Sequence, residues 1–321
     1  MSVLIFAEGN SGEIKKSSHD AIGFGAELAK KLNTSAVAIV IGKYSAESIQ
    51  ELGKFGASKV LHVDHDKLNE PLPMPYASVL ADAAEKGGFD TVILPKSSLS
   101  DAMSSRLAIK MNAAIVTNVM EVPDTSAGFR IKKAIYSGKA FSHIDITAPK
   151  RVLTVVKNAF LNEPSGSNAQ VETFVPQINE GDFKVKVKEV QKATGEILLT
   201  DADIVVSGGR GLKGPENWHL VLDLAKELGA ATGCSKPVSD LDWRPHHEHV
   251  GQTGIKVSPN IYIALGISGA IQHLAGVNSS KVIVVINKDP EAPFFKAADY
   301  GIAGDIFEIV PKLIKAAKEL K

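Results

Sequence analysis

Short apolar runs alternate with longer amphipathic stretches along most of the chain. Runs with the length and β-branched content of buried strands stand at residues 3–7, 36–41, 59–63 and 91–94. Stretches with helical spacing lie between and after them, at residues 21–32, 76–86 and 102–110. This alternation predicts an α/β fold built from βαβ units.

The pattern changes in the middle of the chain. Segments 131–136 and 151–156 are expected to be additional antiparallel strands appended to the first sheet. Residues 161–195 are polar, and the alternation of Lys and Val at 184–188 predicts an exposed edge strand before a linker. We therefore expect two domains, residues 1–192 and 193–321.

The second half restarts the α/β rhythm. Continuous apolar runs at residues 203–207, 261–265 and 282–286 predict buried parallel strands. Residues 218–228 place Leu220, Val221, Leu224, Ala225 and Leu228 on one helical face, and a further helix is expected to close the chain. Two consecutive doubly wound units are the architecture that this arrangement favours.

Composition narrows the class of protein. With 321 residues and 44% hydrophobic content, the chain is long enough for two separate cores. Its 36 basic and 36 acidic residues balance, so nucleic acid and anionic membranes are not expected partners. The single cysteine, Cys234, excludes an intramolecular disulfide and suits a reducing compartment. Because the first residues enter a strand at once and no long apolar span is present, we expect a cytoplasmic protein without membrane insertion.

Two turns rich in glycine carry the most specific chemistry. Residues 250–254 read Val-Gly-Gln-Thr-Gly, and residues 266–269 read Gly-Ile-Ser-Gly directly after the strand at 261–265. Gly266 and Gly269 allow a ligand to approach the backbone, and Ser268 is expected to cap a helix that begins near Ala270. Exposed N–H groups at such a turn attract a phosphate. The alternative interpretation is an ordinary strand-to-helix turn with a serine cap.

A second glycine pattern is ambiguous. Residues 209–214 match G-x-G-x-x-G after a predicted strand, as in dinucleotide-binding domains. About 20 residues further on, where an acidic side chain would hold the ribose, the chain has Ser235 and Lys236. This weakens a nicotinamide interpretation, but Arg210 still offers a fixed positive fork to a phosphate or a flavin edge.

Other polar residues have both a functional and a plain interpretation. Lys236 follows a predicted strand, where ligands of open sheets bind, yet it could be a surface charge. Residues 246–249 read His-His-Glu-His, but their consecutive spacing favours a solvated loop over a zinc site. Cys234 is expected to be a small buried residue rather than a nucleophile.

Asn287 and Asp305 each lie just past a predicted strand. Both side chains suit the ribose hydroxyls or the adenine edge of a nucleotide. For Asp305 the alternative is an N-cap for the last helix.

Together these motifs resemble the electron transfer flavoprotein α subunit family. The resemblance is carried by Ser-Gly-Gly-Arg-Gly-Leu at 207–212, the 250–254 turn, Gly-Ile-Ser-Gly-Ala-Ile-Gln-His-Leu-Ala-Gly at 266–276, Ile-Asn-Lys-Asp-Pro-Glu-Ala-Pro at 286–293 and Ala-Asp-Tyr-Gly at 298–301. It covers about residues 200–321. Residues 1–190, which open with Val-Leu-Ile-Phe-Ala-Glu at 3–8, resemble the family's N-terminal domain.

The resemblance implies a fold, a cofactor and partners. It implies an adenine-nucleotide-hydrolase-like N-terminal α/β domain that packs with a β subunit, and a doubly wound C-terminal domain that binds FAD. It further implies an electron carrier without substrate turnover of its own. Electrons would come from dehydrogenases, such as the acyl-CoA dehydrogenases of fatty-acid β-oxidation, and pass through an anionic semiquinone to a quinone oxidoreductase or another acceptor. AMP or a second FAD would belong to the β subunit of the heterodimer.

The motifs also imply which side chains surround FAD. These are Arg210, Ser235, Lys236, Val250, Gly251, Gln252, Thr253, Ser268, Gly269, Ala270, Ile271, Gln272, His273, Asn287, Asp305 and Ile306. The turn at Ser268 suits the pyrophosphate, and Asn287 and Asp305 suit the adenosine half. Thr253 and a cationic or donating His273 would face the isoalloxazine and stabilise negative charge on the reduced ring.

Lys236 departs from the family pattern, which commonly has Arg at this position. Lysine keeps the charge but loses the planar stacking face and the rigid fork. The alternatives to an electron carrier are a nicotinamide-linked dehydrogenase that uses residues 209–214 and a binding module with a vestigial pocket. The identity of the donor dehydrogenases, and whether the carrier bifurcates electrons, depend on the β chain.

Overall fold

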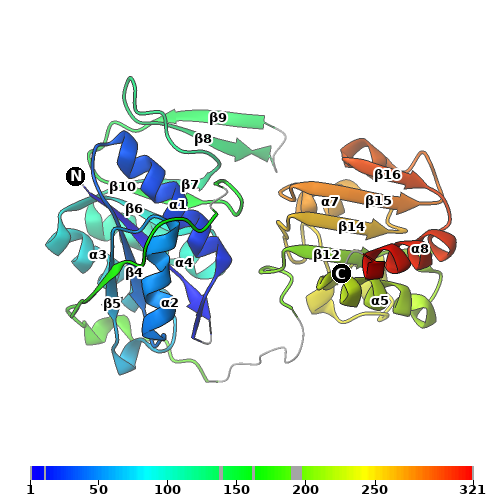
Figure 1. Ribbon diagram of the computed structural model, residues 1–321, viewed down its shortest axis with the longest axis horizontal. Helices are drawn as coiled ribbons and strands as arrows, with labels where there is room; N and C mark the ends of the chain where they lie inside the picture. The colour runs from blue at the N-terminus through cyan, green and yellow to red at the C-terminus, as the bar shows by residue number, and fades with distance from the viewer. Residues whose placement is uncertain (1, 11, 137–139, 161–162, 189–196, 320–321) are drawn as a thin grey trace. The chain divides into compact units, whose positions relative to one another are not determined.

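The chain folds into two compact units, Met1–Val190 and Gln191–Lys321. The structure is a computed structural model that describes residues 2–10, 12–136, 140–160, 163–188 and 197–319 (Figure 1). The domain boundary expected between residues 192 and 193 lies outside these described residues. Both units are α/β, which confirms the predicted fold class.

The first unit is built on a nine-stranded sheet with the order β11-β5-β4-β1-β6-β10-β7-β8-β9. Its strands are β1 (Ser2–Ala7), β4 (Ala36–Ile41), β5 (Lys59–Val63), β6 (Phe89–Pro95), β7 (Ala114–Val119), β8 (Arg130–Ile135), β9 (Ala140–Asp145), β10 (Arg151–Val155) and β11 (Gln170–Thr173), with a separate small hairpin of β2 (Gly9–Asn10) and β3 (Glu13–Ile14). Its helices are α1 (Lys16–Lys31), α2 (Ala46–Gln50), α3 (Pro73–Gly87) and α4 (Ser98–Met111).

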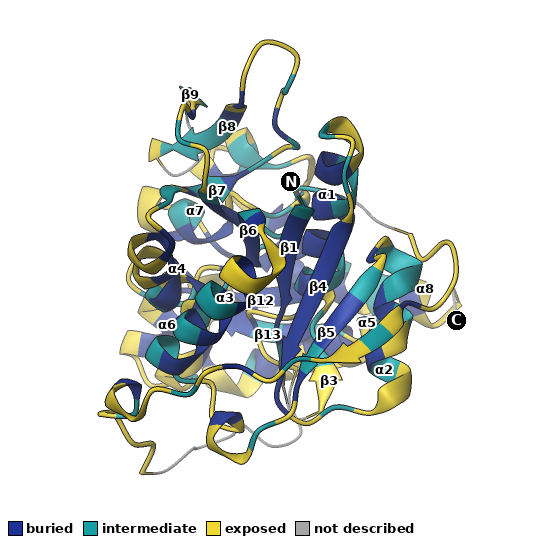
Figure 2. Ribbon diagram, turned by 90° about the vertical axis from the view of Figure 1, so that its left-hand side faces the viewer, coloured by how far each residue is buried: buried dark blue, intermediate teal, exposed yellow. Residues whose placement is uncertain are grey.

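Helices cover both faces of this sheet because successive strand residues point to opposite sides. Val3 and Ile5 of β1 pack in the cluster that includes α1, whereas Leu4 and Phe6 pack in the cluster that includes α3 and α4. Figure 2 shows β1 and β4 buried along their length. Continuous apolar runs are the expected sequence of strands buried on both faces.

One of the two predicted antiparallel strands is in fact parallel. β8 pairs antiparallel with β7 and β9, as predicted. β10, by contrast, lies between β6 and β7 and is parallel to both. Val152, Leu153 and the two residues that follow are buried, so this run has the double burial of a central parallel strand. After β7 the chain forms β8 and β9 at the edge of the sheet and then returns to place β10 between β6 and β7. Local sequence does not reveal this return.

The predicted edge strand at residues 184–188 does not form. The structure has no regular secondary structure there, and those residues are exposed. The edge of the sheet is β11, which runs parallel to β5. In that pair Lys59 contacts Glu172 at 2.8 Å, so opposite charges face each other across the edge.

The second unit has a five-stranded sheet in which every pairing is parallel, with the order β13-β12-β14-β15-β16. Figure 1 shows β12, β14, β15 and β16 side by side. The strands are β12 (Ile204–Gly208), β13 (Ala231–Cys234), β14 (Ile261–Leu265), β15 (Val282–Asn287) and β16 (Tyr300–Ala303), and the helices are α5 (His219–Leu228), α6 (Lys236–Asp240), α7 (Ile271–Val277) and α8 (Ile306–Glu319).

Two apolar clusters make this sheet doubly wound. Val206, Ile263 and Leu265 pack with α5, α6 and α8, whereas Val205 and Tyr262 pack in the cluster that includes α7. Strands β12, β14 and β15 and helices α5 and α8 therefore confirm the sequence prediction, whereas the bounds of the two outer strands were not predicted. Among the residues that the structure describes, no helix has the length and apolar character to cross a membrane.

Two leucines of α5 provide a test of this packing. Leu224 is 1% exposed and Leu222 is 43% exposed. We expect Leu224→Ala to lower the free energy of unfolding by about 2–5 kcal/mol because it leaves a cavity. Leu222→Ala should change it by less than about 0.5 kcal/mol. Both tryptophans, Trp218 and Trp243, lie in the second unit, so tryptophan fluorescence during urea unfolding reports on this unit. Equal losses in the two variants would contradict the packing.

Candidate functional site

The carboxyl ends of the five parallel strands place most of the predicted cofactor residues along one edge of the second sheet. Arg210 follows β12, Ser235 and Lys236 follow β13, Ser268 and Gly269 follow β14, Asn287 ends β15, and Asp305 and Ile306 follow β16. Parallel pairing puts all these strand ends on the same side. The structure thus brings together residues that are up to about a hundred positions apart in the sequence.

The topology singles out one position on that edge. From β12 the chain passes first to β13 on one side and then to β14 on the other. Ligands of open α/β sheets bind in the crevice where the strand order reverses in this way. Here the strand order reverses at the turn after β12 and the turn after β14, which are the two glycine-rich segments 209–214 and 266–269.

These two turns pack backbone against backbone. The Gly209 N–H donates to the Leu265 carbonyl at 2.9 Å, and the Gly211 N–H donates to the Gly266 carbonyl at 3.1 Å. A Cβ on Gly209 would lie 2.3 Å from the Gly266 oxygen. Gly266 itself has φ +62°, in the left-handed region. Glycine is required at these positions so that the two turns can meet.

The same hydrogen bonds argue against a nicotinamide dinucleotide at residues 209–214. In that fingerprint the glycine turn opens a helix whose N–H groups bind the pyrophosphate. Here residues 210–212 form a short 3₁₀ helix, and the N–H groups of Gly209, Gly211 and Leu212 donate to backbone carbonyls. The turn serves to fix the backbone, and the side chains of Arg210 and Lys213 are exposed on it.

The turn after β14 is held by Phe294. The Phe294 N–H donates to the Ser268 carbonyl at 3.0 Å, and Gly269 has φ +82° with its missing Cβ directed at Phe294. The expected serine cap is wrong, because the N-cap of α7 is Ala270 and no side chain caps it. Ser268 stands two residues earlier and is exposed, so its hydroxyl is not committed to the helix.

The 250–254 turn is tied to both β13 and α7. The Val250 N–H donates to the Cys234 carbonyl at 2.9 Å, and the Gln252 N–H donates to the Gln272 carbonyl at 2.7 Å. A Cβ on Gly276 would lie 2.5 Å from the Gly251 Cα, so the turn sits directly on the helix. Gln252 and Thr253 are exposed on this turn. They are thereby placed beside the α7 residues Ile271, Gln272 and His273.

His273 is buried beneath this turn with an exposed fraction of 7%. Its Nε2 lies 2.9 Å from the Tyr262 hydroxyl, while Nδ1 is buried without a hydrogen bond of ordinary geometry to the described residues. Burial and the nearby His249 lower the pKa of His273 to about 4, and the Val250 backbone acts in the opposite direction. Of the two forms expected from sequence, a cation or a neutral donor, this environment supports the neutral donor at neutral pH.

The side chains of Asn287 and Asp305 each form a hydrogen bond with the protein backbone. The Asn287 amide donates to the Ile267 carbonyl at 3.0 Å, which links β15 to the turn after β14. One Asp305 carboxylate oxygen accepts from the Phe307 N–H at 3.0 Å, so Asp305 caps the start of α8, which was the alternative interpretation. Its other oxygen lies 4.0 Å from Lys288 Nζ at a partly exposed position.

Residues 246–249 and Cys234 do not form a reactive site. His246 and His247 are exposed, but Glu248 and His249 are buried, so the expected solvated loop is only half correct. Glu248 accepts from the Arg244 guanidinium, with Nε at 2.9 Å. Burial raises the pKa of the Cys234 thiol to about 12, which leaves it protonated. Among the described residues, no cluster of His, Cys, Asp and Glu could hold a metal ion.

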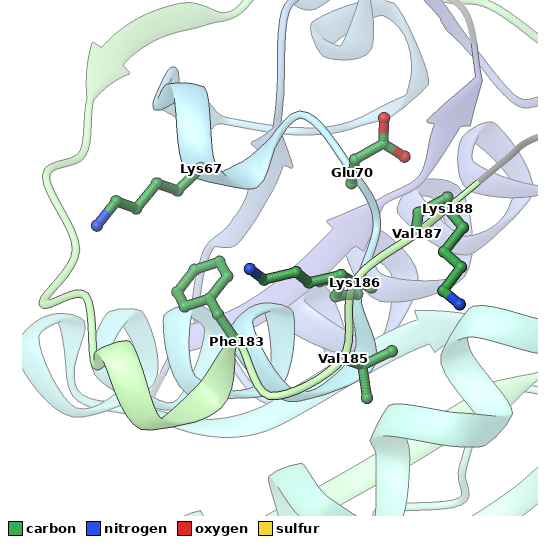
Figure 3. A pocket seen from close by; sticks show the side chains of 8 residues that line it. Lys67, Glu70, Phe183, Val185, Lys186, Val187 and Lys188 are labelled. Atoms are coloured by element: carbon green, nitrogen blue, oxygen red, sulfur yellow. The ribbon is translucent and has the colours of Figure 1, made fainter.

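Sequence reasoning missed Tyr262 and the cavities of the first unit. Tyr262 stands in an apolar strand, where its hydroxyl was the available signal of a polar partner. A cavity of about 570 Å³ is lined by Lys67, Glu70, Phe183 and the stretch at 185–188, as Figure 3 shows. None of the predicted cofactor residues lines it.

Comparison with known proteins connects both units to one family. Residues 3–179 match the electron transfer flavoprotein domain, and residues 198–278 match the electron transfer flavoprotein FAD-binding domain. The predicted cofactor residues from Arg210 to His273 fall within the second match. Asn287, Asp305 and Ile306 lie beyond it.

Curated relatives match over nearly the whole chain. An electron transfer flavoprotein subunit alpha of Bacillus subtilis is 36% identical and aligns over 99% of this chain and 98% of its own. One from Pseudomonas aeruginosa is 36% identical over 98% of this chain and 100% of its own. A probable mitochondrial subunit alpha of Caenorhabditis elegans is 35% identical over 98% and 93%. The chain therefore belongs to the electron transfer flavoprotein α subunit family.

Proposed function

We propose that this chain is the α subunit of a heterodimeric electron carrier and binds one FAD at the carboxyl edge of the second sheet. The observation that supports this most directly is that five strand ends share one edge, on which the strand order reverses between β12 and β14. The match to a family FAD-binding domain covers the loops on both sides of that reversal. A shared topology and a shared motif therefore indicate the same location.

The residues present fit a flavin dinucleotide. The two glycine turns leave backbone without side chains at this edge, and Ser268, Gln252, Thr253 and Lys236 are exposed around it. His273 has a buried Nδ1 that lacks a well-aligned protein partner. Because buried polar atoms are almost always hydrogen-bonded, such an atom beside this edge suits a ligand acceptor.

Each part of the edge has a proposed role. The turn at Ser268 and Gly269, with Arg210 nearby in the topology, would hold the pyrophosphate, and Asn287 with Asp305 and Ile306 would hold the adenosine half. Ser235, Lys236, Val250, Gly251, Gln252 and Thr253, with Ala270, Ile271, Gln272 and His273 of the α7 region, would surround the isoalloxazine. Lys236 would place a positive charge near the ring, and His273 would donate to its carbonyl edge.

The finer assignments also belong to this proposal. FAD supplies the redox chemistry that side chains lack, and the protein positions it and adjusts its potential. We propose dehydrogenases, including those that act on acyl-CoA in fatty-acid β-oxidation, as donors and a quinone oxidoreductase as acceptor. The β subunit would complete the heterodimer and carry its own AMP or second FAD. A cytoplasmic location stays a prediction from the cysteine content.

Co-expression with the β subunit tests the central proposal. We expect a yellow heterodimer, and a count of flavins per pair after denaturation should assign one FAD to this chain. A colourless pair that takes up no FAD from solution would contradict the proposal. Turnover with a nicotinamide cofactor and no flavin would favour the dehydrogenase alternative.

Glycine substitutions test the location of the cofactor. Gly266 and Gly229 have nearly the same φ, +62° and +61°. A Cβ at Gly266 would lie 2.8 Å from the Gly211 Cα, whereas nothing lies within 4 Å of one at Gly229. We expect Gly266→Ala to weaken FAD binding by about tenfold or more, because the two turns must separate. Gly229→Ala carries the same backbone strain and should leave flavin fluorescence titrations unchanged. Equal weakening in both would show that strain alone matters.

Lys236 provides a test of electrostatic tuning. An arginine there regains a planar fork that holds its charge in one place. We expect Lys236→Arg to raise the midpoint reduction potential of the bound flavin, because a fixed cation stabilises the reduced ring's negative charge. Lys226→Arg, on the exposed surface of α5, is the matched control. Potentials that agree within error for wild type and Lys236→Arg would show that this position does not tune the flavin.

A further inference from the structure

A single buried hydrogen bond connects the core of the second sheet to His273. Tyr262 of β14 is fully buried, and its hydroxyl lies 2.9 Å from His273 Nε2 on α7. The Phe294 ring packs beside both, with centroids 6.4 Å from the Tyr262 ring and 5.7 Å from the His273 ring. This enclosure keeps water away from the hydrogen bond, and the buried Ser207 side chain is a second polar neighbour of the Tyr262 hydroxyl.

The direction of this hydrogen bond decides which nitrogen of His273 carries the proton. A neutral imidazole has one N–H, and the partner of one nitrogen sets the state of the other. Burial raises the pKa of Tyr262, so the phenol keeps its proton and is able to donate. The other ring nitrogen, Nδ1, is buried without a well-aligned partner among the described residues, so it is the nitrogen left for a ligand. With Tyr262 as the donor to Nε2, the single proton of the neutral ring stays on Nδ1, where a ligand can receive it.

We propose that Tyr262 is a positioning residue for His273: its hydroxyl donates to Nε2 and thereby fixes the proton on Nδ1. This inference rests on the proposed function, because the cofactor would receive the hydrogen bond from that Nδ1–H. Tyr262 is fully buried, so it would act on the cofactor only through His273.

The surroundings of His273 support a fixed neutral donor. Among the residues that the structure describes, the titratable groups that face it are Tyr262 from β14 and His249 from the segment before the 250–254 turn, and Phe294 is uncharged. The turn packs over the helix, with a Cβ on Gly251 reaching 3.8 Å from the His273 Cα. A donor held between a buried phenol and a packed turn needs no reorganisation when charge develops beside it.

The ¹⁵N spectrum of the imidazole tests this assignment without the cofactor. The full chain is labelled at histidine, and the His273 signals are identified by their loss in His273→Asn. We expect a pyrrole-type Nδ1 and a pyridine-type Nε2 in the wild type across neutral pH. In Tyr262→Phe the proton should distribute between the two nitrogens. A protonated Nε2 in the wild type, or an unchanged tautomer in Tyr262→Phe, would overturn the inference.

The reduction potential of the FAD-loaded heterodimer provides the second readout. We expect Tyr262→Phe to lower the midpoint potential and to weaken FAD binding by about 5- to 10-fold, because the donor is no longer fixed. Tyr76→Phe is the matched control, since the Tyr76 hydroxyl is also buried and donates to the Leu68 carbonyl at 2.9 Å, in the first unit. Equal effects of the two variants would contradict positioning. If the wild-type heterodimer binds no FAD, the proposed function fails, while the ¹⁵N spectra still decide the role of Tyr262.

Discussion

The close approach of two glycine turns at the edge of the second sheet is the contact on which the candidate site depends. Gly209 and Gly211 donate to Leu265 and Gly266, and this continues the β12–β14 pairing beyond the strands. A side chain at either position would push the turns apart. The two turns can therefore meet only because the backbone is bare where the strand order reverses.

The first unit has the same kind of strand reversal, but charged and polar side chains occupy the position beyond its strand ends. Its chain passes from β1 to β4 on one side and later to β6 on the other, so its crevice lies beyond β1 and β6. Glu8 follows β1 there, accepts from Ser97 after β6 and pairs with Lys15 at 2.6 Å. The cavity beside it measures about 160 Å³, below the roughly 300–1,000 Å³ of typical ligand sites.

The polar groups of the second unit show how burial and a buried hydrogen-bond partner set the protonation state of a side chain. His273 is made a neutral donor by burial and by the Tyr262 hydroxyl, and Cys234 is kept a protonated thiol by burial. Exposed side chains such as Arg210 and Lys236 keep an accessible positive charge. The edge therefore has exposed positive side chains at its surface and one fixed hydrogen-bond donor, His273, beneath them. This arrangement suits a redox cofactor, whose charge changes while its position does not.

The sequence by itself determined the three central strands of the second sheet, the glycine turns and the family, because these depend on local composition and on short motifs. It also indicated which residues lie at strand ends, since parallel strands share one edge. Only the tertiary structure decided that β10 is central and parallel, that Ser268 does not cap α7 and that Asp305 does cap α8. It likewise showed that the N–H groups of the 209–214 turn are already bound and that Tyr262 meets His273. These outcomes depend on which distant groups compete for each donor and acceptor, and that competition is settled only when the sheet and its helices are packed.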